Sequence, residues 1–234
     1  MRNVPIEKWL NSLCDEQRRS LQHDLFSSFS SSSDLDLIRC TSTSQMISLH
    51  NSISFTRRIE SIFHCQRESF FDVKEDLLHK ISNVATNASS TVNQLQQRKE
   101  HTLILQMIHH RDIIETLIKN NCNHSSDWVW VSQLRYSLEN DCCNIKIGDA
   151  LFKYSFEYQG NEERLVQTML TDKCYLNLTQ AMRFGFGGNP FGPAGTGNFY
   201  VNIPAVIVFI SISLSIFFIY IDIIIKVKLK LSKL

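Results

Sequence analysis

A glycine-rich loop carries the most informative chemistry of this sequence. Gly192 and Gly197 have the spacing of a phosphate-binding loop, G-x-x-x-x-G-K-[ST]. In such a loop, backbone N–H groups surround the phosphates, the lysine reaches the β- and γ-phosphate oxygens, and the hydroxyl binds Mg²⁺. Asn198 and Phe199 stand where the lysine and the hydroxyl residue are expected. The pattern therefore predicts a nucleotide site that lacks its two reactive side chains.

The candidate nucleotide-binding residues are those of the loop itself. They are Gly192, Pro193, Ala194, Gly195, Thr196 and Gly197. Asn198 cannot offset the charge on the β- and γ-phosphates, and Phe199 has no hydroxyl for Mg²⁺. Because in-line phosphoryl transfer needs the metal, the lysine and a positioned water together, we expect no ATPase activity from this chain alone and predict no catalytic residue. A P-loop enzyme with an unorthodox loop is an alternative that requires measurable nucleotide affinity.

The composition excludes several classes of protein. Of the 234 residues, 43% are hydrophobic and 20% are charged, as in ordinary globular chains. A net charge of +1 gives no reason to expect a nucleic-acid partner. The seven cysteines are scattered without C-x-x-C spacing, which argues against a disulfide framework and against a zinc site. His109 and His110 would point about 100° apart on a helix, so we predict no metal site there.

The first 125 residues predict a mostly helical array. Apolar residues recur at helical spacing over residues 1–25, 44–63, 72–85 and 94–119. The stripe on the first of these helices contains Trp9, Leu10, Leu13, Leu21 and Leu25. Polar or serine-rich stretches predict loops at 27–33, 86–91 and 120–127.

The pattern changes after residue 126. Residues 128–130 and 152–158 alternate in character and predict short strands, and residues 179–185 predict a short helix. We expect Trp128 and Trp130 to pack in the core rather than on a binding surface. Six of the eight glycines then fall between Gly185 and Gly197.

The last 37 residues, 198–234, form a hydrophobic tail. Residues 203–221 contain no charge over 19 positions, which is long enough to cross a bilayer, and four lysines follow them. One interpretation is a genuine membrane anchor. The other, which we favour, is translation past an exon boundary, because the tail begins within one residue of the expected lysine. No signal peptide is expected, since the first eight residues lack an apolar core.

Several ordered blocks of sequence resemble one known family, the dynein heavy chains. The blocks are Gln133–Tyr136, Phe152–Gly160, Leu170–Tyr175, Leu178–Ala181 and Gly187–Gly197, with Glu7–Leu10, Ser44–Ile47, Ile53–Thr56 and Ile108–Ile113 upstream. The resemblance covers about residues 5 to 197. Residues 156–161 and 188–191 are most similar to the intraflagellar-transport class, cytoplasmic dynein 2.

The resemblance implies a fold and a division of the chain. The fold would be α+β, with a mostly helical linker segment at 1–125, an incomplete AAA+ (P-loop) α/β module at 126–197 and a hydrophobic C-terminal helix in 198–234. The parallel sheet of such a module needs strands beyond the loop, so we expect exposed sheet edges. By the resemblance, Leu170, Thr171 and Asp172 would lie near the adenine side of the nucleotide pocket, where Met169 replaces the family's usual proline.

The resemblance also implies a function as part of a motor protein. Dynein heavy chains are minus-end-directed microtubule motors, in which ATP hydrolysis at the first AAA+ module drives a power stroke of the linker. The implied cofactor is ATP with Mg²⁺ in the full-length family, and we expect none to be bound by this chain alone. The implied partners are intermediate, light intermediate and light chains and microtubules, in the cytoplasm, cytoskeleton and cilium.

One alternative of a different class remains open. A small tail-anchored membrane protein would use residues 203–221 as its anchor and the helical part as a partner-binding cytosolic body.

Overall fold

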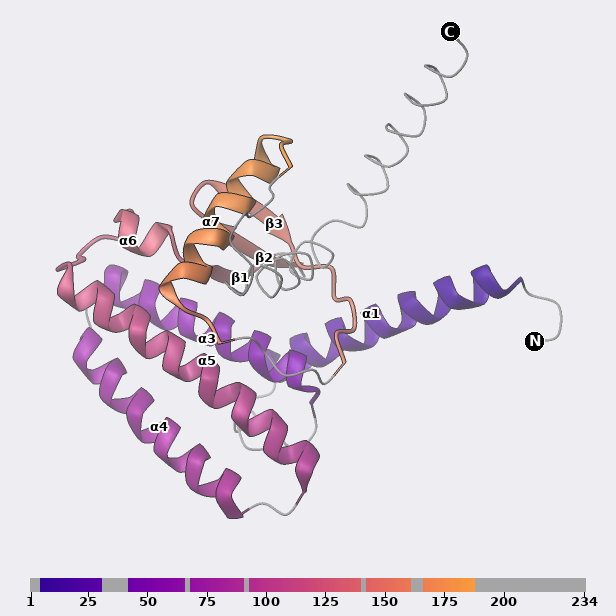
Figure 1. Cartoon of the computed structure of the whole chain (residues 1–234), viewed down its shortest axis with the longest axis horizontal. Coiled ribbons are helices and arrows are strands. Elements are labelled where there is room, and N and C mark those ends of the chain that lie inside the picture. The colour runs from indigo at the N-terminus through magenta and orange to yellow at the C-terminus, as the bar shows by residue number, and fades with distance from the viewer. Residues whose placement is uncertain are drawn as a thin grey trace, which may run out of the picture.

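The computed structural model describes residues 5–30, 42–65, 68–90, 93–139, 142–160 and 166–187. Its elements in chain order are α1 (Ile6–Ser30), α3 (Ser44–Cys65), α4 (Phe70–Ser90), α5 (Gln94–Lys119), α6 (Trp128–Val131), β1 (Arg135–Glu139), β2 (Cys142–Ile147), β3 (Ala150–Lys153) and α7 (Met169–Arg183). The described part is mostly helical with one small sheet, which confirms the predicted α+β class (Figure 1).

Three long helices, α3, α4 and α5, form the body of the molecule (Figure 1). One continuous apolar core joins them, because each contributes residues from one stripe of its surface. Ile59 from α3, Val73 from α4 and Ile114 from α5 are each buried to 1% exposure or less. The four helices predicted from apolar periodicity are thus confirmed.

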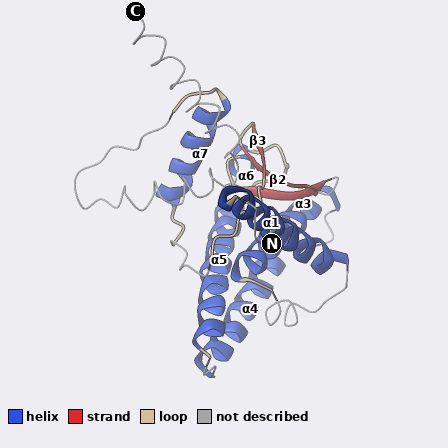
Figure 2. Ribbon diagram, turned by 90° about the vertical axis from the view of Figure 1, so that its right-hand side faces the viewer, coloured by secondary structure: helices blue, strands red, loops and turns tan. Residues whose placement is uncertain are grey.

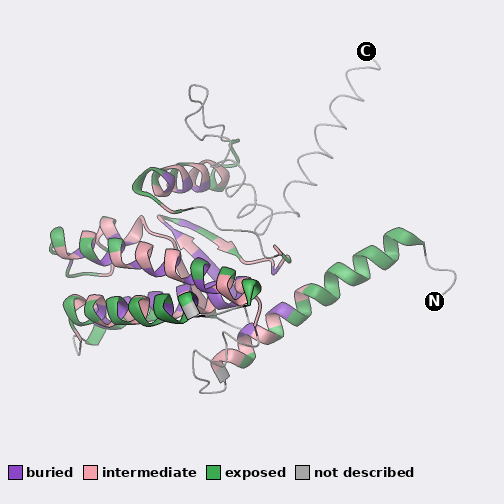
Figure 3. Ribbon diagram, turned by 60° about the horizontal axis from the view of Figure 1, so that its bottom comes forward, coloured by how far each residue is buried: buried purple, intermediate pink, exposed green. Residues whose placement is uncertain are grey.

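α1 is buried over only one half of its length. Leu21 and Leu25 pack into a second apolar cluster with residues of α3 and the sheet. The other half projects beyond the body, and Figure 3 shows it exposed. Trp9, Leu10 and Leu13 are 52%, 46% and 42% exposed. The predicted stripe is therefore confirmed as a helix face, but only its C-terminal part is core.

The sheet is antiparallel, with the order β1-β2-β3. Figure 2 shows its strands in red beside the helices. β1 packs beside α3, and β3 packs beside α7 at the opposite edge. The backbone N–H of Tyr136 in β1 donates to Thr56 Oγ1 of α3 at 3.1 Å, so one edge amide is satisfied by a helix side chain. All three described strands precede the glycine-rich loop in the chain. Their antiparallel sheet differs from the parallel sheet expected of an AAA+ module.

The predicted strand at residues 128–130 is wrong, because this segment is the short helix α6. Asp127 Oδ2 accepts hydrogen bonds from the backbone N–H groups of Asn123 and His124, which tightens the turn before the helix. In a strand, residues two apart share a face, whereas in a helix they point about 200° apart. Trp130 is accordingly 1% exposed and Trp128 63% exposed. The core prediction is right for Trp130 and wrong for Trp128.

Two helices run further than the sequence suggested. α1 continues to Ser30 into the predicted loop at 27–33, and α4 continues to Ser90 through most of the predicted break at 86–91. Hydroxyl groups in both ends donate to carbonyls one turn earlier: Ser28 to Leu25 at 2.6 Å and Thr86 to Ser82 at 3.0 Å. In these two helices, the small polar residues form hydrogen bonds to carbonyls of the same helix and do not end it.

Two other boundaries also differ. β3 ends at Lys153, so only the beginning of the predicted strand 152–158 is a strand. The helix predicted over 179–185 is α7, which begins ten residues earlier at Met169.

The hydrophobic tail lies outside the described residues, and with it the predicted span 203–221. Among the helices that the structure describes, none has the length and apolar character needed to cross a membrane. The C-terminal helix therefore stays a prediction.

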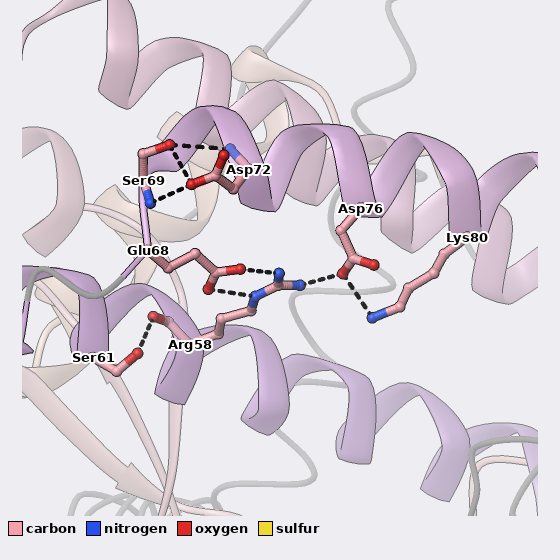
Figure 4. Close-up of polar contacts among 7 residues, drawn as sticks. All are labelled: Arg58, Ser61, Glu68, Ser69, Asp72, Asp76 and Lys80. Atoms are coloured by element: carbon pink, nitrogen blue, oxygen red, sulfur yellow. Dashed lines mark hydrogen bonds and ion pairs between the residues drawn. The ribbon is translucent and has the colours of Figure 1, made fainter.

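An ion network joins α3 to the start of α4 (Figure 4). The Arg58 guanidinium forms a two-point contact with Glu68 and a further contact with Asp76, which Lys80 also contacts at 2.9 Å. Burial acts against ionisation of Asp76, but the hydrogen bonds from Lys80 and Arg58 hold its pKa below the usual value. The hydrogen bonds to Glu68 correspondingly raise the pKa of Arg58. The network fixes the α3–α4 turn.

We expect Arg58→Met to lower the free energy of unfolding by about 1–3 kcal/mol, because two partly buried carboxylates lose their partner. The loss should shrink at acid pH, since stability from a depressed carboxylate pKa is lost as pH falls through the folded value. Urea denaturation at pH 7 and pH 3 measures both effects. Arg111→Met is the matched control, because Arg111 bonds only its neighbour Asp112 on the surface, and the control should change stability by less than about 0.5 kcal/mol. Equal losses in the two variants would contradict the prediction.

Candidate functional site

The segment 154–160 connects the sheet to the part of the chain that leads towards the glycine-rich loop. Its backbone is unusual at Phe156, which has φ 54 although it is not a glycine. Such a left-handed conformation costs of the order of 1 kcal/mol and persists only where the surroundings impose it. The Phe156 ring supplies the constraint, because it is 5% exposed and packs edge-on against Tyr154 with ring centroids 5.0 Å apart.

Two helices hold this segment from the side. Gln45, at the start of α3, donates through Nε2 to Tyr154 Oη and to the Glu157 carbonyl, both at 2.7 Å. Its Oε1 accepts the backbone N–H of Gln159 at 3.1 Å. Arg18 of α1 adds an ion pair with Glu157 at 3.0 Å. The segment is therefore anchored by side chains rather than by strand pairing.

α7 begins with a reciprocal cap. Thr168 Oγ1 accepts the backbone N–H of Thr171 at 3.3 Å, and Thr171 Oγ1 accepts the backbone N–H of Thr168 at 2.8 Å. This capping box satisfies two amides that the first turn leaves without partners. Thr171, which the resemblance placed near the adenine side of the pocket, thus starts the helix, while Met169 and Leu170 beside it are 75% and 66% exposed.

α7 is docked onto the β2–β3 turn. Gln180 Nε2 donates to the Ile147 carbonyl at 3.1 Å. Gly148, with φ +55, forms the turn, and a Cβ atom there would lie 2.5 Å from Gln180 Nε2. Glycine is therefore favoured at this position by the left-handed backbone of the turn, and a side chain there would also displace the Gln180 amide. The contact fixes the direction in which α7 carries the chain towards residue 187.

A buried acid and a histidine meet between α5 and α7. His109 Nε2 lies 3.8 Å from Asp172 Oδ1, with the side chains 12% and 24% exposed. Burial raises the pKa of Asp172 to about 6. Burial also lowers the pKa of His109, although the nearby Asp112 acts in the opposite direction. At neutral pH the contact is therefore an ionised carboxylate beside a neutral imidazole, too far apart for a direct hydrogen bond.

His110 faces the core instead, where its ring stacks on Phe55 at 3.9 Å. Within the described ranges, no group of three His, Cys, Asp or Glu side chains could hold a metal ion.

The predicted nucleotide-binding residues, 192–197, lie outside the described residues, as do Asn198 and Phe199. The structure therefore brings together the elements before the loop and leaves the loop assignment as a prediction. These elements are the segment 154–160, α7 and the residues that anchor them, and the structure describes the chain up to Gly187.

Comparison with known proteins assigns this region. Residues 154–199 match a family model described as the hydrolytic ATP binding site of dynein motor region. The chain is 37% identical over 202 residues to the human cytoplasmic dynein 2 heavy chain 1, covering 82% of this chain and 5% of the human protein. It is 38% identical over 198 residues to the Caenorhabditis elegans protein of the same name, covering 84% of this chain and 5% of that protein.

The chain belongs to the dynein heavy chain family. A Chlamydomonas reinhardtii relative, the dynein-1-beta heavy chain of the flagellar inner arm I1 complex, is 34% identical over 198 residues, with 82% of this chain and 4% of the relative covered. The predicted resemblance is confirmed. The chain spans about one twentieth of the length of the dynein heavy chains that it matches.

Sequence reasoning missed the residues that anchor the segment before the dynein ATP-binding region. Gln45 is the second residue of a helix, a position where polar side chains are usually solvated, and nothing in its neighbourhood indicates a contact 112 residues away. The left-handed conformation of Phe156 has no sequence signal either, because the favoured residues there are glycine and asparagine. His109 and Asp172 lie in two of the sequence blocks that carry the resemblance, but nothing in the sequence indicates that their side chains meet.

We expect Asp172→Asn to stabilise the protein at pH 8 but not at pH 4. The folded-state pKa is raised above the unfolded value, so the folded state holds the proton more tightly, and stability is lost as pH rises through about 6. Removing the charge should recover about 1–2 kcal/mol at pH 8, less than the roughly 3 kcal/mol of the full shift because water reaches the carboxylate.

Urea denaturation at the two pH values measures this difference. Asp149→Asn is the control, since the Asp149 side chain is 81% exposed. A gain of the same size at both pH values would show that the Asp172 charge is not responsible.

Proposed function

We propose that this chain is the region of a dynein heavy chain in which the linker meets the first AAA+ module. The single observation that supports this most strongly is the family match, which begins at Tyr154, directly after β3 ends at Lys153. Residues 1–125 are assigned to the C-terminal part of the linker, 126–197 to the start of the module, and 198–234 to the hydrophobic tail. Three helices of the first region, α3, α4 and α5, pack around one core, which supports their assignment to the same region.

In this proposal, the loop residues Gly192 to Gly197, apart from Pro193, present backbone N–H groups to the phosphates of ATP in the full-length protein. The preceding scaffold orients the loop: the cap at Thr168 starts α7, and the contact of Gln180 with the β2–β3 turn fixes where the helix ends. Leu170 to Asp172 lie at the adenine side. In this chain, Asn198 and Phe199 replace the lysine and the hydroxyl residue, so the loop offers phosphate only backbone N–H groups and offers Mg²⁺ no hydroxyl at position 199.

A full-length protein in which the lysine and the hydroxyl residue follow Gly197 would be a minus-end-directed microtubule motor of the cytoplasmic dynein 2 type. ATP with Mg²⁺ would be its cofactor, and dynein intermediate, light intermediate and light chains and microtubules its partners. It would act in the cytoplasm, on the cytoskeleton and in the cilium. The names of the human and Caenorhabditis elegans relatives support the type.

This chain alone should release no phosphate from ATP in response to microtubules, because the lysine and the Mg²⁺ hydroxyl act together in phosphoryl transfer. A phosphate-release assay with purified chain, with and without microtubules, measures this. An active dynein motor run in parallel shows that the assay responds. Turnover by the chain above a buffer blank would overturn the expectation.

The loop assignment predicts a gain of function. The double variant Asn198→Lys with Phe199→Thr should bind Mg·ATP at least about tenfold more tightly than the unaltered chain, because a charge-assisted contact to phosphate is worth about 1.5–3 kcal/mol. Calorimetry at millimolar nucleotide measures the affinities.

The matched control for the double variant is Asn202→Lys, which adds the same charge outside the motif. Equal binding by the control and the double variant would show a general charge effect, and no gain in either would reject the loop.

A further inference from the structure

The Gln45 side chain is the most specific link between the helical array and the segment that starts the ATP-binding region. Gln45 is 5% exposed, and its amide makes three hydrogen bonds to this segment, one through Oε1 and two through Nε2. A backbone N–H can only donate and a backbone carbonyl can only accept. The bonds with Gln159 and Glu157 therefore fix which end of the amide faces which group.

The segment is held by such side-chain contacts rather than by strand pairing. Residues 154–160 lie beyond β3, and one ladder-like backbone bond, from Tyr154 N–H to the Cys143 carbonyl at 2.8 Å, marks where pairing ends. Two residues later the backbone adopts the costly conformation at Phe156. Gln45 contacts residues on both sides of Phe156. Its three bonds therefore span the strained turn and hold both flanks to one helix.

A second buried glutamine shows what an ordinary structural role looks like in this fold. Gln106 of α5 is also 5% exposed, and its Nε2 donates to the Ser48 carbonyl at 2.9 Å and to Ser52 Oγ at 2.5 Å. Its Oε1 accepts from Asn51 Nδ2 at 3.2 Å. All of these partners lie on α3, within the helical array. The two glutamines match in type, burial and number of bonds, and differ in what they hold.

We propose that Gln45 is a positioning residue that couples the helical array to the dynein ATP-binding region by fixing the conformation of residues 154–160. The proposal rests on the proposed function, in which residues after 154 begin the nucleotide-binding module. Within the described part of the chain, the hydrogen bonds of Gln45 go to this segment and not to Leu170, Thr171 or Asp172. Gln45 acts through the segment. When its three hydrogen bonds are present, α3 and residues 154–160 move together.

The first test is local and independent of ATP. Hydrogen–deuterium exchange is measured on the full chain for Gln45→Met and Gln106→Met, which keep side-chain length and remove the amide. Exchange of the amides at 157–160 should rise about tenfold or more in Gln45→Met and stay within about twofold in Gln106→Met. Equal loosening in the two variants would show that Gln45 contributes only to general stability and would overturn the proposal.

A milder variant guards against unfolding. Tyr154→Phe removes one of the three bonds and leaves the two backbone contacts of Gln45 in place. It should give an increase in exchange that is smaller than that of Gln45→Met and confined to the same residues. No increase at 157–160 in Tyr154→Phe, or an increase spread over α3 and α5, would count against the proposal.

The second test uses a complete, active dynein heavy chain in which residues 5–187 of this chain replace the matching region, so that the lysine and the hydroxyl residue of the phosphate loop are present. Gln45→Met should reduce the speed of microtubule gliding by at least about fivefold while microtubule-stimulated ATP turnover stays within about twofold, because coupling rather than chemistry is lost. Gln106→Met should leave the ratio of speed to turnover unchanged. A parallel fall of speed and turnover in Gln45→Met would overturn the coupling role. If the unaltered heavy chain shows no microtubule-stimulated turnover, the proposed function fails, and the exchange experiment still decides whether Gln45 positions the segment.

Discussion

The structure depends on the burial of α3, which packs against α1, α5 and the sheet at once. A helix covered on several sides must bury polar residues, and each of these needs a partner because an unsatisfied buried group costs about 1–3 kcal/mol. The buried polar residues of α3 find their hydrogen-bond partners on different neighbouring elements. Ser52 receives a bond from α5, Thr56 receives the edge amide of β1, and Gln45 binds the segment beyond the sheet. Apolar packing brings the elements together, and these polar contacts fix their register.

This arrangement explains how a small sheet is retained beside a helical array. A three-stranded antiparallel sheet is only marginally stable alone and requires a packed apolar face. β1 gains that face from α3, with Tyr136 and Leu138 packed against Leu49 and Ile53. β3 lies at the other edge beside α7. The region assigned to the ATP-binding module therefore begins on a platform that the helices supply, and the two assigned regions share a core rather than meet at an exposed surface.

Periodicity predicted the helices well and the sheet poorly, for identifiable reasons. Long helices repeat their apolar stripe several times, so 94–119 was predicted at both ends as the structure has it. The sheet strands have four to six residues, and β2 buries Cys143, Asn144 and Ile145 in succession, which hides the alternation that marks a strand. Residues 128–130 alternate but form a helix, because the turn at Asp127 imposes the local conformation. The anchoring contacts of Gln45 join residues more than a hundred positions apart, and no local pattern encodes them.

The described elements before the glycine-rich loop have a self-consistent local structure, whereas the sequence of the loop lacks two side chains expected of an ATP site. Up to Gly187, local choices are mutually consistent: a reciprocal cap begins α7, a glycine stands where a side chain would strike Gln180, and a left-handed glycine at 185 follows the end of α7. The departures that remove chemistry from the family pattern are the side chains at 198 and 199, which lie outside the described residues. A site can therefore retain its supporting structure and lose its chemistry, because the support is built from packing and backbone hydrogen bonds, whereas phosphoryl transfer requires one cation and one hydroxyl at fixed positions.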